Sequence, residues 1–230
     1  MTGVIAAMPQ ELEAVLAYMD VKEEREVGKV RFYRGWLEGQ ELVIALAGVG
    51  EMSASMAAGL LCALYEPECL INVGVAGGLH AEQHPGDLVI GSELIQADFD
   101  TSPLDGEKGV GQFFQADPVL VSEMEDVAKE LEIPFRTGAI ATQDLFMARD
   151  VDYFALMEKF PRSLASEMEG AAVAFAASRF DIPFVVLRTL SDVVHHENNP
   201  MEFETFARKS ADRAALLLKN WAARQSGIER

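Results

Sequence analysis

Several ionisable side chains stand within or just after apolar runs of the sequence, where such groups are uncommon. Asp192 follows the apolar run 183–190, Arg188 lies inside that run, and Glu11 follows the apolar run 3–8. Burial disfavours a charged carboxylate and raises its pKa, which would leave Asp192 protonated and able to act as a general acid. A simpler explanation for Asp192 alone is a turn-capping hydrogen bond.

Glu11 falls in the first turn of a helix expected from Pro9 to about Met19. The positive end of the helix dipole favours an ionised carboxylate there and predicts a lowered pKa for Glu11. An ionised Glu11 could accept a proton from water. Acidic residues are also common in first helical turns for electrostatic reasons alone, so the position does not by itself require catalysis.

Arg188 needs an anionic partner, because an unpaired charge buried in an apolar strand is strongly destabilising. Glu167 and Glu169 flank Met168 and could supply that partner. A carboxylate held by arginine could in turn accept two hydrogen bonds from a sugar diol. Both glutamates also fit the enrichment of acidic residues at the start of the helix expected over 169–180.

Glycine segments and a histidine pair give weaker signals. Gly77 and Gly78 allow close backbone approach to a ligand, but they form neither a Walker loop nor a dinucleotide-binding fingerprint. The segment 48–50 fits a tight turn between a strand and a helix. The segment 195–197 (His-His-Glu) could suggest a metal, but no second cluster of histidine or cysteine completes the ligand set, so we expect no metal site.

Apolar strands and helices alternate along the chain and must position these residues. Strands are expected over residues 3–8, 30–37, 41–49, 69–75, 87–95, 137–142 and 183–190. Helices are expected over residues 9–19, 51–64, 119–131, 169–180 and 203–224. The segment 97–118 has weak periodicity and is expected to be a long loop. The pattern predicts a single α/β domain over residues 1–230, with a mostly parallel sheet that binds ligands at the carboxyl ends of its strands.

The composition excludes several classes of protein. Half of the 230 residues are hydrophobic, and 37 acidic residues against 19 basic ones give a formal net charge of −18. Such a charge repels nucleic acids and acidic membranes, so neither is expected as a partner. The apolar runs are too short to span a bilayer and no signal peptide is recognisable, which predicts a cytoplasmic protein. Cys62 and Cys69 are expected to be reduced core thiols.

In this order, the segments resemble the nucleoside phosphorylase/hydrolase superfamily and, within it, the 5′-methylthioadenosine/S-adenosylhomocysteine nucleosidase family. The most specific match is the pair of segments Ser166–Glu169 and Arg188–Asp192. The resemblance covers nearly the whole chain. Further matching segments are 6–11, 48–50, 72–78, 85–87, 98–100, 143–146, 166–171 and 183–188.

The resemblance implies a three-layer α/β/α fold with a central twisted mixed sheet, and hydrolysis of the bond between adenine and ribose. Asp192 would protonate the purine at N7, Ser191 would help to position Asp192, and Glu11 would activate the attacking water. Glycosidases that use direct water attack divide the work between two carboxyl groups in the same way. No cofactor would be required.

The resemblance also implies a set of substrate-binding residues. Glu169 would bind the ribose hydroxyls with Arg188 orienting it, and Met168 would pack on the sugar. Phe146 would stack on adenine while the backbone at Met147 reads the edge of the base. The remaining contacts would come from Met8, Val49, Ala76, Gly77, Glu167 and Phe203, with Val49 and Phe203 bordering the 5′ group.

A homodimer is implied as well, with residues 98–118 near the active site of the partner subunit. This chain departs from the family in that region, at Thr101–Leu104, which leaves the preferred 5′ substituent open. It also has Val73 and Val75 where the family often has serine or threonine, so polar contacts near the attacking water would differ.

Three other functions remain as alternatives. A purine nucleoside phosphorylase needs a cationic phosphate pocket, and the segment 72–79 carries no basic residue. A futalosine-type hydrolase shares the chemistry and differs in the 5′ substituent, so the motifs do not separate it. A nucleoside-binding protein without activity would not need both Glu11 and Asp192.

Overall fold

The computed structural model describes residues 1–193 and 200–227, with the side chains of 200–206 outside the described set. Its strands are β1 (Thr2–Ala6), β2 (Asp20–Val27), β3 (Val30–Leu37), β4 (Gln40–Leu46), β5 (Cys69–Gly78), β6 (Leu88–Asp100), β7 (Val110–Gln115), β8 (Phe135–Thr142), β9 (Ser163–Glu167) and β10 (Phe184–Val193). Its helices are α1 (Pro9–Leu16), α2 (Glu51–Tyr65), α3 (Ser102–Asp105), α4 (Pro118–Glu130), α5 (Asp150–Lys159), α6 (Gly170–Arg179) and α7 (Pro200–Gln225), with a short 3₁₀ turn at Gly106–Gly109.

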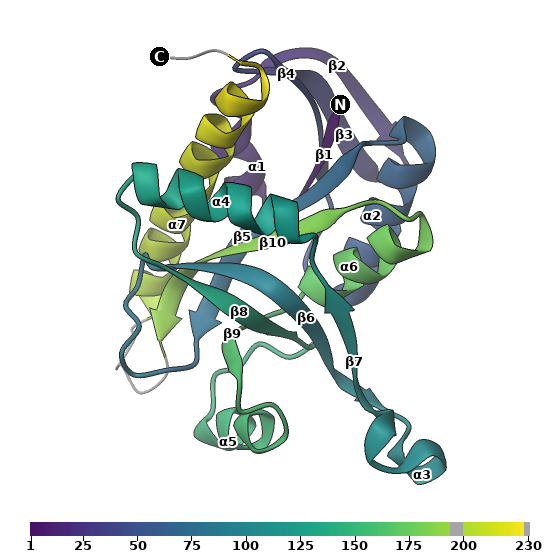
Figure 1. Ribbon diagram of the computed structural model, residues 1–230, viewed down its shortest axis with the longest axis vertical. Coiled ribbons are helices and arrows are strands. Elements are labelled where there is room, and N and C mark those ends of the chain that lie inside the picture. The colour runs from purple at the N-terminus through teal and green to yellow at the C-terminus, as the bar shows by residue number, and fades with distance from the viewer. Residues whose placement is uncertain (194–199, 228–230) are drawn as a thin grey trace.

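The strands form one mixed sheet centred on β5 (Figure 1). Strand β5 pairs in parallel with β1 on one side and with β10 on the other, and β4, β3 and β2 continue beyond β1. Beyond β10 the order is β6, β8 and β9, and β9 pairs back onto the end of β5 in antiparallel register. The sheet therefore closes on itself through β5, β10, β6, β8 and β9.

Helices cover both faces of the sheet, which confirms the expected α/β/α layers. Helices α1, α4 and α7 pack together on one side, and α2 and α6 pack together on the other (Figure 1). The mixed sheet is also confirmed, but the expectation that it is mostly parallel is wrong. Strands β2, β3, β6, β7 and β9 all take part in antiparallel pairs.

The carboxyl ends of β1, β4, β5 and β10 meet at one edge, because these strands run parallel. Strands β5 and β10 are buried over almost their whole length, which explains their near-continuous apolar sequence. A register shift between Leu190 and Asp192 places Asp192 opposite Gly77. Such irregularities re-aim side chains near strand ends, and here the shift sets the position of the carboxyl group.

The segment 97–118 is not a long loop, so that expectation is wrong. Strand β6 runs on to Asp100, helix α3 and the 3₁₀ turn follow, and β7 returns along β6 (Figure 1). Strand β2 was also missed, because all but the last of its side chains are exposed and its sequence DVKEEREV has no apolar alternation. Helix α5 and strand β9 were likewise not anticipated.

Two further expectations can be compared with the structure. Cys62 and Cys69 are free and buried, as expected, and burial raises the pKa of each thiol to about 11. Among the helices in the described part of the chain, none is both long and apolar enough to cross a membrane.

Candidate active site

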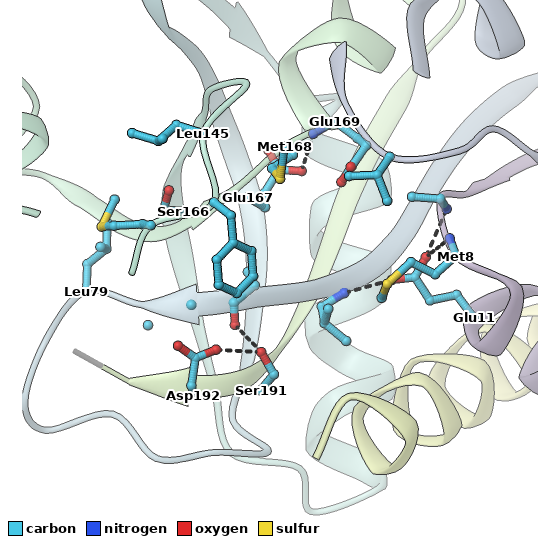
Figure 2. Close-up of a pocket in the computed structure, with 18 residues that line it drawn as sticks. Met8, Glu11, Leu79, Leu145, Ser166, Glu167, Met168, Glu169, Ser191 and Asp192 are labelled. Carbon is cyan, nitrogen blue, oxygen red and sulfur yellow. Dashed lines mark hydrogen bonds between the residues drawn. The ribbon is translucent and has the colours of Figure 1, made fainter. Parts of the chain in front are cut away.

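A cavity of about 310 Å³ lies at the carboxyl ends of β1, β5 and β10 (Figure 2). Its lining includes most of the residues singled out from the sequence: Met8, Glu11, Val49, Ala76, Gly77, Phe146, Met147, Glu167, Met168, Glu169, Ser191 and Asp192. Gly78, which allows close backbone approach, also lines the cavity, together with residues for which no substrate contact was expected: Ala7, Val75, Leu79, Leu145 and Ser166. The expectation that ligands bind at the carboxyl ends of the strands thus located the site, although it did not identify every residue in the cavity wall.

Asp192 lies at the end of β10 with its carboxyl group over Gly77. The hydroxyl of Ser191 is 2.6 Å from Asp192 Oδ1 and 3.3 Å from the carbonyl oxygen of Ala76, and it can donate to either. Burial raises the pKa of Asp192, and the Ser191 hydrogen bond offsets only part of this rise. The raised pKa favours a protonated Asp192 with an acidic proton to donate, as the sequence predicted.

Glu11 lies in the first turn of α1 and is anchored entirely by backbone groups. The N–H groups of Ala7 and Met8 donate to Oε2, each at 2.9 Å, and that of Val75 donates to Oε1 at 3.2 Å. Glu11 therefore caps α1 and also joins β1 to β5.

The predicted direction of the Glu11 pKa shift is wrong. The pKa is raised, because burial of a side chain that is only 3% exposed outweighs the backbone hydrogen bonds and the charge of Arg188. The helix dipole favours the ionised form of a surface carboxylate, but the depth at which Glu11 is buried cannot be read from residue order. A raised pKa makes the ionised Glu11 a stronger base than an exposed glutamate.

Arg188 lies behind the cavity wall and is fully buried. Its Nε donates to Glu167 Oε2 at 3.1 Å, and its Nη2 donates to the same oxygen and to Asn72 Oδ1 at 2.6 Å. The distance from Nη2 to Glu169 Oε2 is 3.8 Å. The expected anionic partner of Arg188 is therefore found in the 167–169 segment, and Glu167 makes the direct contacts.

Glu167 accepts hydrogen bonds from protein groups on both oxygens. Besides Arg188, the Thr142 hydroxyl donates to Oε1, and the N–H groups of Glu169 and Gly170 donate to Oε2 at 2.9 and 2.7 Å. Although Glu167 borders the cavity, its acceptors are engaged in fixing the start of α6. This arrangement points to a positioning role and away from the direct substrate contact that the sequence analysis assigned to it.

Glu169 is held on one oxygen and is open on the other. The N–H of Gly50 donates to Oε1 at 3.0 Å, while among the described residues Oε2 has only the longer contact with Arg188, and Glu169 lines the cavity. Burial and the neighbouring Glu167 raise the pKa of Glu169, and Arg188 opposes that rise. Glu169 can therefore accept hydrogen bonds from a ligand diol through Oε2.

Gly74 makes the close packing of Glu11 and Arg188 feasible. A Cβ atom at Gly74 would lie 3.0 Å from Glu11 Oε1 and 3.2 Å from Arg188 Nη1. Both charged groups occupy the space that a side chain would fill, so this strand position requires glycine.

The loop that carries Phe146 and Met147 is fastened by Asp144. The N–H of Glu51 donates to Asp144 Oδ1 at 2.8 Å, and the N–H of Asp144 donates to Asp98 Oδ2 at 2.9 Å. These bonds tie the loop to the start of α2 and to β6, next to the Gly50 that holds Glu169. The exposed ring of Phe146 is thereby placed at the cavity mouth.

Two buried polar residues of this network were missed from the sequence. Asn72 bridges Arg188 and the carbonyl oxygen of Ile5, to which its side chain donates at 3.0 Å. The Thr142 hydroxyl donates to Glu167 and accepts from the N–H of Ala171 at 2.8 Å. An asparagine inside an otherwise apolar strand was the available signal for Asn72, since such a group must find buried partners.

Two predictions fall outside the described residues. The side chain of Phe203 belongs to the part of α7 that is not described, so its expected place beside the 5′ group stays a prediction. The segment 195–197, considered as a metal site, is likewise outside the described ranges. Within residues 1–193 and 207–227, no cluster of acidic, histidine or cysteine side chains could hold a metal ion.

Known proteins resemble this chain over almost its full length. The family model of the phosphorylase superfamily matches residues 2–222. A 5′-methylthioadenosine/S-adenosylhomocysteine nucleosidase of Oceanobacillus iheyensis is 36% identical over 222 residues, which is 95% of this chain and 96% of that protein.

Solved structures resemble it in fold as well. The crystal structure of the 5′-methylthioadenosine/S-adenosylhomocysteine nucleosidase from Neisseria meningitidis in complex with methylthio-immucillin-A has a TM-score of 0.90 and 29% identity, covering 97% of this chain and 98% of that chain. The native structure of futalosine hydrolase of Helicobacter pylori strain 26695 has a TM-score of 0.88 and 30% identity, covering 96% of this chain and 96% of that chain.

The buried ion pair makes a prediction about stability. Arg188→Met should lower the free energy of unfolding by about 3–5 kcal/mol, because it leaves the Glu167 carboxylate buried without its cation. Arg188→Met combined with Glu167→Gln should lose less than the single variant, because no uncompensated charge remains. Urea unfolding followed by circular dichroism measures both.

The partly exposed Arg34–Glu41 pair, with side chains 42% and 29% exposed, supplies a control. Arg34→Met should change the unfolding free energy little, since exposed ion pairs contribute little. Equal stability of Arg188→Met and the unsubstituted protein would show that the buried pair does not hold the site together.

Proposed function

Because the chain belongs to the phosphorylase superfamily and, within it, to the 5′-methylthioadenosine/S-adenosylhomocysteine nucleosidase family, we propose that it hydrolyses the N-glycosidic bond of both nucleosides. The products are adenine and the corresponding 5′-thio-ribose. One observation carries the proposal: the buried Glu11 and the partly buried Asp192 lie in the wall of one cavity, and each has a raised pKa.

Asp192 is the general acid of the proposed reaction. As the bond between ribose and adenine breaks, electrons flow into the base, and a proton from Asp192 to N7 neutralises the developing charge. The Ser191 hydroxyl lies within reach of both Ala76 O and Asp192 Oδ1. It can therefore turn to donate to Asp192 when the carboxyl group loses its proton, which stabilises the carboxylate that forms.

Glu11 is the general base. Three backbone N–H groups hold its carboxylate in a fixed orientation beside Val75, so it can take a proton from a water that attacks the ribose carbon. The ribose carries positive charge at that stage, and the nearby carboxylates of Glu11 and Glu169 are favourable neighbours for it. General acid and general base catalysis each contribute on the order of 10²–10⁴-fold to the rate.

The remaining contacts follow from the cavity wall. The free oxygen of Glu169 binds the ribose hydroxyls, and Met8 and Met168 pack against the sugar with their thioether groups. Phe146 covers the base and the Met147 backbone reads its edge, while Ala76 and Gly77 allow the substrate to approach the sheet. Val49 borders the 5′ group.

Water, and not phosphate, is the proposed nucleophile. None of the described residues that line the cavity is basic. The guanidinium of Arg188 is turned to Glu167 and Asn72 behind the wall. A phosphate dianion would face Glu11 and Glu169 without a counter-charge, which disfavours phosphorolysis.

A homodimer is part of the proposal. Exposed apolar side chains lie on the first turns of α2, on α3 and on β7: Met52 is 82% exposed, Met56 is 50%, Leu104 is 87% and Phe113 is 51%. Helix α3 also projects from the body of the protein (Figure 1). A second copy packed on this surface would cover these side chains and bring residues 98–118 towards its active site.

A cytoplasmic location is also proposed. Its support is that Cys62 and Cys69 are free thiols, which persist in a reducing compartment.

The direct test of the reaction follows adenine release from methylthioadenosine, with and without phosphate. We expect release at the same rate in both, and release from S-adenosylhomocysteine as well, while futalosine is included as a competing substrate. Release that requires phosphate would make the protein a phosphorylase. Release from futalosine alone would reassign the 5′ preference, and absence of release from every nucleoside would refute the proposal.

The two carboxyl groups predict a bell-shaped pH profile. The ratio kcat/KM should fall at low pH as Glu11 gains a proton and can no longer act as a base. It should fall at high pH as Asp192 loses the proton that it donates. Because burial raises both pKa values, both limbs should lie above the ordinary carboxyl range. A profile that stays flat upwards from the ordinary carboxyl range would contradict the acid role of Asp192.

The dimer surface predicts the effect of Leu104→Glu. A charge on this exposed leucine should dissociate the dimer and raise KM at least several-fold, because the neighbouring active site loses its cover. Analytical ultracentrifugation and steady-state kinetics measure the two effects. Leu216→Glu, at a half-exposed position on α7 away from this surface, is the control. A Leu104→Glu variant that remains dimeric with unchanged KM would count against the proposed interface.

A further inference from the structure

The hydroxyl of Ser166 is a polar group in the cavity wall to which no role has yet been assigned. The other polar side chains of the lining, Glu11, Glu167, Glu169, Ser191 and Asp192, all have hydrogen-bond partners in the protein. Within the described chain, Ser166 Oγ has none. Ser166 is only 8% exposed and lines the cavity, so the accessible part of its side chain faces the ligand space (Figure 2).

The sheet register places Ser166 and Asp192 on either side of Gly77. Ser166 pairs with Gly77 across the antiparallel β9–β5 contact, and Asp192 pairs with Gly77 across the parallel β10–β5 contact. Residues directly opposite each other in neighbouring strands point to the same face of a sheet. The hydroxyl and the carboxyl groups therefore flank one glycine on one face.

Gly77 leaves the space between them open. Two strand spacings separate the backbones of Ser166 and Asp192 by about 10 Å. A Cβ atom at Gly77 would lie 3.6 Å from Asp192 Oδ2, so any side chain there would fill this space. A flat ring that rests on Gly77 with one edge at Asp192 extends towards Ser166.

We propose that Ser166 is a specificity-determining residue that donates a hydrogen bond to a ring nitrogen of the purine other than N7. The proposal rests on the proposed function, because it takes N7 to lie at Asp192. A serine hydroxyl is both donor and acceptor, and the unprotonated ring nitrogens N1 and N3 of adenine are acceptors.

The apolar surroundings of Ser166 mean that this hydrogen bond should strengthen binding of the base. The cavity wall that Ser166 shares also contains Leu79, Leu145 and Met147, whose side chains carry no nitrogen or oxygen atom to offer a base. When a ring nitrogen leaves water for this apolar region, it loses a hydrogen bond that Ser166 replaces. The bond forms equally with the nucleoside and with adenine, so it should affect KM and leave kcat unchanged.

The first experiment compares Ser166→Ala with a matched control on the same strand. Ser163 is also a buried serine of β9, but it does not line the cavity, so Ser163→Ala should retain the KM of the unsubstituted protein. Ser166→Ala should raise KM for methylthioadenosine about three- to tenfold with unchanged kcat, which is the effect of one hydrogen bond. Ser166→Thr retains the hydroxyl and should keep most of the affinity.

A second experiment identifies the partner of the hydroxyl. Isothermal titration calorimetry measures the dissociation constants of adenine, 1-deazaadenine and 3-deazaadenine, each deaza base lacking one ring nitrogen. In the unsubstituted protein one deaza base should bind more weakly than adenine, and in Ser166→Ala that same difference should disappear. Unchanged adenine affinity in Ser166→Ala, or equal deaza differences in both proteins, would overturn the proposal.

These measurements separate this proposal from the proposed function. Adenine binding does not require turnover, so it tests the Ser166 contact even if no nucleoside is cleaved. If adenine binds with the predicted Ser166 dependence and no nucleoside releases it, the reaction assignment fails alone. If adenine does not bind at all, the Ser166 contact fails.

Discussion

The buried ion pair between Arg188 and Glu167 is the interaction on which the rest of the site depends. Both side chains are almost completely buried, so neither charge can remain without the other. Arg188 also binds Asn72 on β5, while Glu167 binds Thr142 on β8 and the first N–H groups of α6. One pair thereby connects four strands, its own β10 and β9 together with β5 and β8, to the start of α6.

The carboxyl groups of Glu11 and Asp192 differ in the number of hydrogen bonds that they accept from the protein. Burial raises the pKa of Glu11, and three backbone N–H donors and the charge of Arg188 offset only part of that rise. Within residues 1–193 and 207–227, Asp192 has one hydrogen-bond partner, Ser191, and burial raises its pKa, which favours the neutral form. Two carboxyl groups of similar chemistry therefore suit opposite tasks, one as base and one as acid.

Much of the site could be predicted from the sequence because strand ends are easily recognised. Asp192 and Glu11 follow apolar runs, and the parallel strands β1, β5 and β10 bring them together. The 167–169 segment reaches the same cavity through β9, which pairs in antiparallel register with the end of β5 and was not anticipated. Periodicity failed for β2, whose polar sequence carries no alternation, and for residues 97–118, where β6 and β7 form a projecting hairpin. The direction of the Glu11 pKa shift depends on burial depth, and the direct contact of Arg188 with Glu167, and not with Glu169, depends on how β9 and β10 are placed in the fold. Neither can be read from residue order.

In the proposed mechanism, Asp192 acts on the leaving base and Glu11 acts on water. The most direct measurement compares Asp192→Asn and Glu11→Gln on methylthioadenosine and on 4-nitrophenyl 5-methylthio-β-riboside, whose phenolate leaves without a proton. We expect that Asp192→Asn loses adenine release but cleaves the nitrophenyl riboside at close to the normal rate. Glu11→Gln should lose both adenine release and cleavage of the nitrophenyl riboside. Equal impairment of Asp192→Asn on both substrates would contradict the proposed mechanism.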